Sequence, residues 1–435
     1  MTTAPLVLVL GANGFISAHV AAALSGAGWR VRAGAREIGN ASRRAPGHDW
    51  VRADFADLTT VADWMPLLAG VQAVVNCVGV LQDGGGDDTR TAHVDGPLVL
   101  IEACEAAGVR RLVHLSAVGA EHAAGTAYAR TKAQTERLLE RSDLDWLILR
   151  PSLVIGRGAF GGTGMVRALA AFPFFIPVVG GDQRVRPVVM DDLAAAVRAA
   201  LNHPELVRRT LDVVGPEAVT LADVLRRYRG WLGLTPAPLV RVPRWVAAPA
   251  LLVGDALARF GWFSPLTTTS MRQLDHDVAG RDDDWSELLG VTPRGFSTFV
   301  DQTPASVQDV WHARLWFVRP VSIATLSLFW TATGLISFGP GWPRALAILQ
   351  EGGYGSAAWA TAWFGALLDV VLGLAILVRR WTARVAVVMA LATVGYLAAA
   401  TLSLPHYWLD PLGPWLKVLP MMALCLFVAA TDARR

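Results

Sequence analysis

Short apolar runs alternate with amphipathic stretches over the first 155 residues. The runs are rich in valine, leucine and isoleucine, as buried strands are, and the stretches between them have helical spacing. In chain order the segments are PLVLVL, 14–27, WRVRAG, 59–69, QAVVNCVG, 89–107, RRLVHLSAVG, 126–141 and DWLILR. This alternation predicts an α/β fold with a doubly wound parallel sheet, because continuously apolar strands need helices on both faces. We assign it to residues 1–155.

The alternation becomes irregular beyond this point. Residues 156–305 are rich in glycine, proline and arginine, with helical stretches near 190–201, 220–232 and 244–260. We interpret them as a smaller substrate-side lobe of the same unit.

Long runs with almost no charge dominate residues 306–435, and each is long enough to cross a hydrocarbon core. A C-terminal four-helix transmembrane bundle is therefore predicted. The expected spans are about 320–341, 357–378, 385–406 and 412–430. Asp369 and Lys417 are the two formally charged residues inside these spans.

Arginine clusters flank the expected spans on one side. The clusters are Arg314 and Arg319, then Arg379, Arg380 and Arg384, and finally Arg434 and Arg435. Positive loops stay in the cytoplasm. We therefore expect a multi-pass protein of a bacterial-type plasma membrane, with both termini and the α/β unit cytoplasmic.

Composition supports a membrane protein and excludes other classes. Hydrophobic residues make up 53% and charged residues 17%, and the mean hydropathy is +0.39. These values exclude a disordered chain. Residues 1–310 hold 30 basic and 32 acidic side chains, and residues 311–435 hold 9 and 4. The basic excess thus belongs to the apolar end, so no nucleic-acid partner is expected.

The three cysteines have no metal-ligand spacing, so no metal site is expected.

A glycine motif, GANGFIS, follows the first predicted strand and opens the first helix. In that context it predicts a dinucleotide site of the Rossmann type, with the pyrophosphate at the helix N-terminus. The candidate cofactor-binding residues are Gly11, Asn13, Gly14, Phe15 and Ile16. Ser17 replaces the usual third glycine, and its hydroxyl is a further candidate for a phosphate. The alternative is an ordinary glycine-rich turn.

Arg36 stands at the end of the second strand, where NAD-binding chains carry an acid. A guanidinium there suits a 2′-phosphate, so NADP(H) is expected over NAD(H), with Arg43 and Arg44 as weaker candidates. These arginines are alternatively solvent-facing. Asp54, after the third strand, is a candidate for the adenine amino group or for capping the next turn.

Tyr128 and Lys132 are spaced one helical turn apart, and Lys132 and Lys417 are the only lysines among 39 basic residues. An ammonium one turn away stabilises a phenolate. With Ser116 and the glycine motif, this pattern resembles the short-chain dehydrogenase/reductase superfamily over roughly residues 5–305. The resemblance implies Tyr128, Lys132 and Ser116 as catalytic residues, with Lys132 also holding the nicotinamide ribose.

The segments VQAVVNCVGVLQ and LILRPSLVIGRG resemble an atypical branch, which includes the nucleotide-binding accessory subunit of respiratory complex I. This resemblance implies that Asn76, Val78 and Gly79 lie under the cofactor. It also implies that Arg150, Pro151 and Ser152 line the nicotinamide end. His93 departs from the family's pattern, because the matching position carries the catalytic asparagine, and this bears on the proton relay.

The ending HYWLDPLGPWLKVLP, within residues 316–435, resembles the DoxX-like membrane family. We expect Asp369 and Lys417 to face the bundle interior and hypothesise that they pair. The alternative is that Lys417 reaches the headgroups while Asp369 bonds a neighbouring hydroxyl.

Together these features predict a membrane-anchored NADP(H)-dependent oxidoreductase that acts on a carbonyl or alcohol of a lipid-soluble substrate. One alternative is a non-catalytic NADPH-binding scaffold or redox-sensing subunit of a membrane complex, whose other subunits would then be partners. A nucleotide-sugar epimerase and a small transporter are lesser alternatives.

Overall fold

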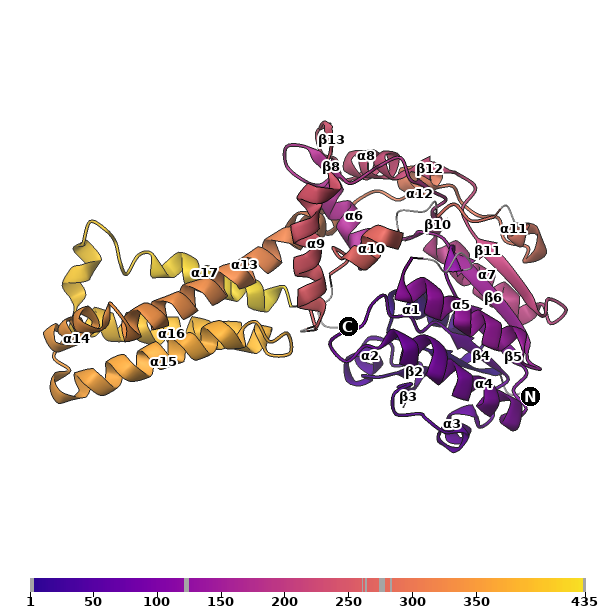
Figure 1. Ribbon diagram of the computed structural model, residues 1–435, viewed down its shortest axis with the longest axis horizontal. Coiled ribbons are helices and arrows are strands. Elements are labelled where there is room, and N and C mark those ends of the chain that lie inside the picture. The colour runs from indigo at the N-terminus through magenta and orange to yellow at the C-terminus, as the bar shows by residue number, and fades with distance from the viewer. Residues whose placement is uncertain are drawn as a thin grey trace. The chain divides into compact units, whose positions relative to one another are not determined.

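The computed structural model describes residues 4–120, 125–259, 261–262, 264–273, 278–281 and 284–432 (Figure 1). Two compact units divide between Arg314 and Leu315, inside one continuous helix. Arg434 and Arg435, which the sequence assigns to the cytoplasmic side, lie outside the described residues.

A seven-stranded parallel sheet forms the centre of the first unit, in the order β11-β6-β5-β4-β1-β2-β3. The strands are β1 (Leu6–Leu10), β2 (Arg30–Ala35), β3 (Asp49–Arg52), β4 (Ala73–Asn76), β5 (Arg111–Leu115), β6 (Asp145–Pro151) and β11 (Arg209–Val213). From β1 the chain builds outward to β3, and it then returns to β4 on the other side of β1. Dinucleotides bind at such a reversal, outside the carboxyl ends of the strands.

Helices cover both faces of this sheet, as the continuously apolar strands predict. Helices α1 (Phe15–Gly26) and α7 (Met190–Asn202) pack on one face, while α3 (Val61–Leu68), α4 (Gly96–Ala107) and α5 (Ala127–Glu140) pack on the other (Figure 1). Within β1, Val7 and Val9 point to the first layer, and Leu8 and Leu10 point to the second. The doubly wound Rossmann-like fold is confirmed.

The lobe packs α6 (Gly162–Ala170), α8 (Leu221–Trp231) and α12 (Phe296–Gln302) around a third apolar core. Its other elements are β7 (Val154–Ile155), β8 (Ile176–Val178), β9 (Arg184–Val185), β10 (Val188–Val189), β12 (Val219–Thr220), β13 (Leu239–Arg241), α9 (Arg244–Arg259), α10 (Thr268–Gln273) and α11 (Trp285–Leu288). Helix α2 (Gly39–Arg44) belongs to the Rossmann-like core, between β2 and β3. Buried Arg167 lies 4.6 Å from the Trp231 ring centre and forms a 3.1 Å ion pair with Asp309. This contact ties the lobe to the start of the helix that leaves it.

The second unit is helical. Its elements are α13 (Val307–Phe338), which begins in the first unit, α14 (Trp342–Glu351), η3 (Gly355–Ala357), α15 (Ala358–Ala375), α16 (Thr382–Ser403), η4 (Pro405–Leu409) and α17 (Val418–Ala430). Gly373 allows α15 to approach α13 closely, because an added methyl group there would collide with Thr331, and Ser327 donates a 2.7 Å hydrogen bond to the Gly373 carbonyl. Small residues commonly mark such contacts between membrane helices.

Three helices of the described chain, rather than four, are long and apolar enough to cross a membrane. They are Val307–Phe338, Gly355–Ala375 and Thr382–Ser403. The span expected at 412–430 becomes helical only at Val418, and its 13 residues extend about 20 Å, less than a hydrocarbon core of about 30 Å. Pro411 and Pro414 flank Gly413, whose φ is +57°, and delay the helix.

The fourth segment nevertheless runs back along the bundle. Helix α17 packs against α16, and Asp432, just beyond α17, forms a 2.8 Å ion pair with Arg319 near the beginning of α13. The two ends of the second unit therefore lie at the same end of the bundle.

The hypothesised pairing of Asp369 with Lys417 is wrong. Lys417 is the N-cap of α17 rather than a residue inside it, and these two described side chains form no ion pair. Asp369 instead accepts a 3.1 Å hydrogen bond from the Tyr396 hydroxyl of α16. Because α17 begins only at Val418, Lys417 lies at the end of the helix and not two turns inside a membrane span, as the sequence suggested.

Candidate functional site

The loop between β1 and α1 has the shape of a dinucleotide-binding turn. Gly11 has a φ of +69°, which favours glycine, and its carbonyl accepts a 2.8 Å hydrogen bond from the Gly14 N–H. Gly14 is the N-cap of α1, and it has no side chain to occupy the first N–H groups of that helix. The turn therefore forms a cradle that fits a pyrophosphate.

The other residues of the glycine motif differ in how far they are buried and in whether their side chains already form hydrogen bonds. Asn13, Phe15 and Ile16 are half-buried around the turn. Ser17 is buried, and its hydroxyl donates to the Gly11 carbonyl. This hydrogen bond stabilises the turn from inside, and a contact of Ser17 with a phosphate stays a prediction.

Arg36 directly follows β2, at the edge of the cradle where an adenosine ribose lies in this fold. Its guanidinium forms an ion pair with Asp87, while 54% of its side chain remains exposed. Asp87 belongs to the loop after β4 and was not identified from the sequence. Asp54 accepts a 3.1 Å hydrogen bond from the Ala56 N–H, so one carboxylate oxygen caps the turn after β3.

The loop after β4 lies directly against the glycine turn. Buried Asn76 accepts a 3.1 Å hydrogen bond from the Val78 N–H, which fixes the loop's first turn. A methyl group on Gly11 would lie 3.5 Å from the Val78 backbone, and one on Gly79 would lie 3.8 Å from Lys132 Nζ. The structure thus brings together the glycine motif, Asn76, Val78, Gly79 and Lys132.

Lys132 is buried beneath this loop. Its ammonium donates hydrogen bonds of 3.1 Å to the Val78 carbonyl and 2.9 Å to the Leu115 carbonyl. An ammonium has three donors, so one remains for a ligand on the Gly79 side. Burial lowers the pKa of Lys132 to about 8, and the neighbouring Cys77 and Glu136 partly oppose this shift.

Tyr128 lies in the first turn of α5, whose N-cap is Thr126. Burial raises the pKa of Tyr128 to about 12, so its phenol is protonated at neutral pH. Ser116 directly follows β5, and its buried hydroxyl lies beside the Glu136 carboxyl, whose pKa it lowers against the larger raising effect of burial. A hydroxyl has one donor and two lone pairs, so Ser116 has a lone pair left to accept a hydrogen bond from a ligand.

His93 lies in the π-helical turn η1 (Thr91–Asp95) and connects the loop after β4 to helix α5. Burial, with a contribution from Lys132, lowers the pKa of His93 to about 2. Its Nε2 accepts a 3.0 Å hydrogen bond from the Val80 N–H, which requires the proton on Nδ1, 2.9 Å from the Thr131 hydroxyl. The ring also meets the Tyr128 ring edge-on, with 5.6 Å between centroids.

The structure shows what His93 does at the position where the family carries its catalytic asparagine. His93 does not titrate near neutral pH, and it holds the Val78–Val80 loop against α5. Its hydrogen-bond partners lie 13 and 38 residues away, so motif spacing did not reveal them.

Arg150 and Pro151 end β6 beside the site and Ser152 follows them, but the side chains of Arg150 and Ser152 bind other groups. Arg150 forms a buried two-pronged ion pair with Glu136, with nitrogen-to-oxygen distances of 2.9 and 2.6 Å. The Ser152 hydroxyl donates a 2.5 Å hydrogen bond to the Val278 carbonyl. Glu136 was missed in the sequence, although it follows Lys132 by one helical turn on the same face.

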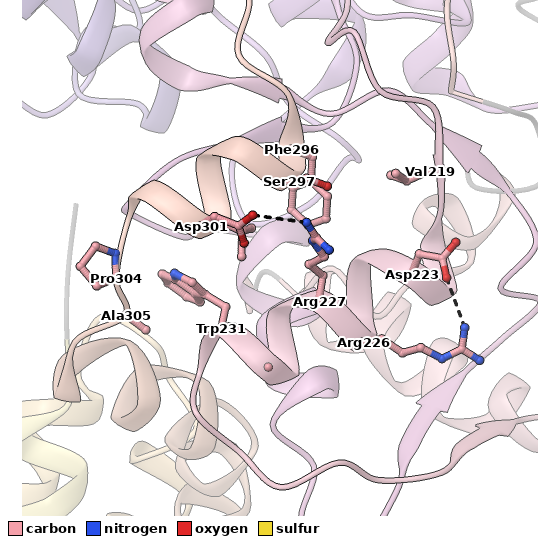
Figure 2. A pocket seen from close by; sticks show the side chains of 12 residues that line it. Val219, Asp223, Arg226, Arg227, Trp231, Phe296, Ser297, Asp301, Pro304 and Ala305 are labelled. Atoms are coloured by element: carbon pink, nitrogen blue, oxygen red, sulfur yellow. Dashed lines mark hydrogen bonds and ion pairs between the residues drawn. The ribbon is translucent and has the colours of Figure 1, made fainter.

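A separate groove of about 930 Å³ lies between α8 and α12 (Figure 2). Figure 2 shows two ion pairs on its walls, Arg227 with Asp301 and Arg226 with Asp223. No predicted site residue lines this groove, so it is distinct from the cradle described above.

Two family models match the chain. The NAD(P)H-binding family matches residues 11–204, and the DoxX-like family matches residues 327–426. The latter agrees with the resemblance of the C-terminal segment, and the former contains the cradle and the Tyr128–Lys132 pair.

Curated relatives extend this likeness. A ceramide reductase of Caulobacter vibrioides is 27% identical over 65% of this chain and 86% of its own length. Subunit 9 of the NADH dehydrogenase 1 alpha subcomplex of Rattus norvegicus is 26% identical over 51% of this chain and 58% of its own length. A 3-diazoavenalumate denitrifying reductase of a Streptomyces species is 30% identical over 63% of this chain and 93% of its own length.

The chain belongs to the same family as this 3-diazoavenalumate denitrifying reductase, a family of NAD(P)H-binding reductases. The family places it among the NAD(P)-binding oxidoreductases, and the complex I resemblance is confirmed. Among solved structures, the UDP-N-acetylglucosamine 4-epimerase of Bacillus cereus has a TM-score of 0.50 at 18% identity and covers 69% of this chain and 98% of its own. That likeness concerns the fold alone.

Proposed function

We propose that this family member is a membrane-anchored, NADP(H)-dependent reductase that converts a carbonyl group of a lipid-soluble substrate to an alcohol. The observation that carries the proposal is the Tyr128–Lys132 pair, with the Lys132 ammonium held by two backbone carbonyls beside Gly79. Gly11, Asn13, Gly14, Phe15, Ile16, Asn76, Val78, Gly79 and Pro151 are the residues that we propose to surround the dinucleotide.

The protonation states favour reduction. Because the pKa of Tyr128 is about 12, its phenol donates a proton to the substrate oxygen as negative charge develops there. Lys132 then stabilises the phenolate that remains, and Ser116 orients the oxygen before transfer. The bound nicotinamide cofactor supplies the hydride to the carbonyl carbon.

Arg36 supports the preference for NADP(H). A 2′-phosphate gains a charge-assisted hydrogen bond from this guanidinium, whereas the 2′-hydroxyl of NAD(H) gains much less. Asp87 competes for the same guanidinium. Replacing Asp87 by Asn should therefore raise NADPH affinity while leaving NADH affinity nearly unchanged.

The membrane unit and a relative named ceramide reductase support a lipid-borne substrate. A substrate dissolved in water gives no reason for a reductase to carry several membrane helices. Arg379 and Arg380 lie between α15 and α16, Arg384 lies in the first turn of α16, and Arg314 and Arg319 lie in the N-terminal half of α13. Positive loops of this kind support a cytoplasmic α/β unit in a bacterial-type plasma membrane.

The test is NADPH oxidation by the full-length protein in phospholipid vesicles that contain a ketone analogue of ceramide. The unsubstituted protein should turn over, and Tyr128→Phe should lose at least about 100-fold in kcat, because general-acid catalysis contributes this much. NADPH binding by Tyr128→Phe, followed through cofactor fluorescence, shows that the variant is folded. Full turnover by that variant would refute the assigned chemistry.

The complex I relative favours a second candidate, in which the chain holds NADPH as a scaffold or redox sensor in a membrane complex. A scaffold keeps its cofactor during purification and exchanges it slowly, whereas a reductase exchanges it in each turnover. Displacement of bound NADPH by excess NADP⁺ separates the two. An epimerase has only the fold likeness in its support.

A further inference from the structure

Helix α9 presents an unusual surface on the lobe. It spans Arg244–Arg259, and its buried positions are Leu251, Gly254 and Ala258, a spacing of three and four residues that defines one narrow face. The rest of the helix is largely exposed. Such a helix has an inner face attached to the lobe and a wider outer face.

That outer face is apolar. Its large side chains include Trp245, Leu252 and Val253, which are 77%, 62% and 57% exposed, together with Val246 and Leu257. Soluble proteins seldom leave such a contiguous apolar group uncovered.

Charge is confined to the ends of this helix and to its inner side. Arg244 and Arg259 are its first and last residues, and no charged residue lies between Arg244 and Asp255. Asp255 is turned inward, where its carboxylate accepts hydrogen bonds of 3.1 and 2.7 Å from the backbone N–H and hydroxyl of Thr268. The outer face therefore has no acidic group to repel anionic headgroups, and arginines mark both of its ends.

A lipid bilayer fits this face better than a protein does. The same chain carries three helices able to cross a membrane, and the first of them begins inside the unit that contains α9. A bilayer surface is thus always present near this unit, whereas a protein partner would have to be recruited. Exposed apolar residues with terminal arginines and a tryptophan are typical of helices that lie in the headgroup region.

The helix also adjoins the candidate site. A methyl group on Gly84, in the loop that carries Asp87, would collide with the Ala258 carbonyl at the end of α9. Helix α10, which packs on α9, places Gln273 in a hydrogen bond with Thr126, the N-cap of the helix that carries Tyr128. Elements that contact α9 therefore form part of the rim of the candidate site.

We propose that the outer face of α9 lies in the headgroup region of the bilayer, as a membrane contact separate from the transmembrane helices. This proposal rests on the exposed apolar face of α9 and on the DoxX-like membrane domain of the same chain, and not on the proposed reductase activity. At about 1.5 Å per residue, the 16 residues give a contact about 24 Å long, parallel to the membrane surface.

The experiment uses the full-length protein in single-copy nanodiscs of phosphatidylcholine and phosphatidylglycerol. Leu252→Cys carries an environment-sensitive fluorophore, and nitroxide groups stand either at the lipid headgroup or near the top of the acyl chain. Asp143→Cys is the matched control, because its side chain is 96% exposed in the turn after α5. The unsubstituted protein, with buried Cys104 and Cys425 and half-buried Cys77, reports background labelling.

We expect the label at position 252 to shift to the blue and to be quenched several-fold more than the label at position 143, most by the shallow acyl nitroxide. A second change, Val253→Asp, should reverse this quenching without altering NADPH binding. Equal weak quenching at both positions would overturn the proposal. A blue-shifted but unquenched label would also overturn it, because another protein surface, from this chain or a second copy, would then cover the helix.

Discussion

Replacing Lys132 by methionine should remove a pH-dependent part of the affinity for NADPH. The ammonium is buried and held by the carbonyls of Val78 and Leu115, which leaves one N–H to meet a ribose hydroxyl. Methionine fills a similar volume but donates no hydrogen bond. Lys132→Met therefore tests the charge of this group with little change of packing.

The magnitude follows from the pKa of about 8 that burial imposes on Lys132. At this value the amine is about nine-tenths protonated at pH 7 and about one-tenth at pH 9. A hydrogen bond from a charged donor contributes about 1.5–3 kcal/mol, which is about 10- to 150-fold in Kd. Because binding uses the protonated form, NADPH affinity should fall by this factor as pH rises through about 8.

The assay is fluorescence titration of the detergent-purified protein with NADPH between pH 6.5 and 10, values chosen to bracket the pKa of about 8. Lys132→Met should bind weakly throughout and show no such fall. Tyr128→Phe is the matched control, because it keeps Lys132 and should retain the same midpoint. An unsubstituted protein whose affinity is flat to pH 9.5, or a Lys132→Met variant with the same fall, would refute the reasoning.

Three further sets of substitutions probe separate contacts. Arg36→Ala should weaken NADPH binding about tenfold or more while sparing NADH, as measured by paired titrations, because it removes a charge-assisted hydrogen bond to the 2′-phosphate. Arg150→Met should cost about 3–5 kcal/mol of stability, because it leaves the Glu136 carboxylate buried and unpaired, and adding Glu136→Gln should restore part of the melting temperature. In the membrane unit, Asp369→Ala and Tyr396→Phe should show a coupling of about 0.6 kcal/mol in a double-mutant cycle of thermal stability, and simple additivity would contradict their hydrogen bond.

Local pattern was sufficient for the fold class. Strands buried on both faces must be largely apolar, and a helix between them must repeat its apolar side chains every three to four residues, so both are visible in the order of residues. The glycine turn was equally visible, since a φ of +69° at Gly11 favours a residue without a side chain. Membrane helices were recognisable because lipid tolerates little charge over some 20 residues.

The fourth membrane segment shows where local pattern fails. Hydropathy alone counted residues 412–430 as a full span. The turn at Gly413, between two prolines, shortens the helix to Val418–Ala430 and moves Lys417 to its N-terminus. The backbone turn therefore decides where this helix begins, although the composition alone fits a longer one. Asp369 is hydrogen-bonded to a tyrosine on the neighbouring helix and not to Lys417.

The sequence by itself determined which residue types gather at the carboxyl edge of the sheet, because each motif directly follows its strand along the chain. Only the tertiary structure decided their partners. Arg36 meets Asp87 from 51 residues away, and His93 meets Thr131 from 38 residues away. Lys132 likewise finds the carbonyls of Val78 and Leu115 only when β4 and β5 lie side by side. Hydrogen bonds and ion pairs act over a few ångströms, so these pairs form only where the crossover connections bring distant strands together. No periodic pattern along the chain predicts which residues become neighbours in this way.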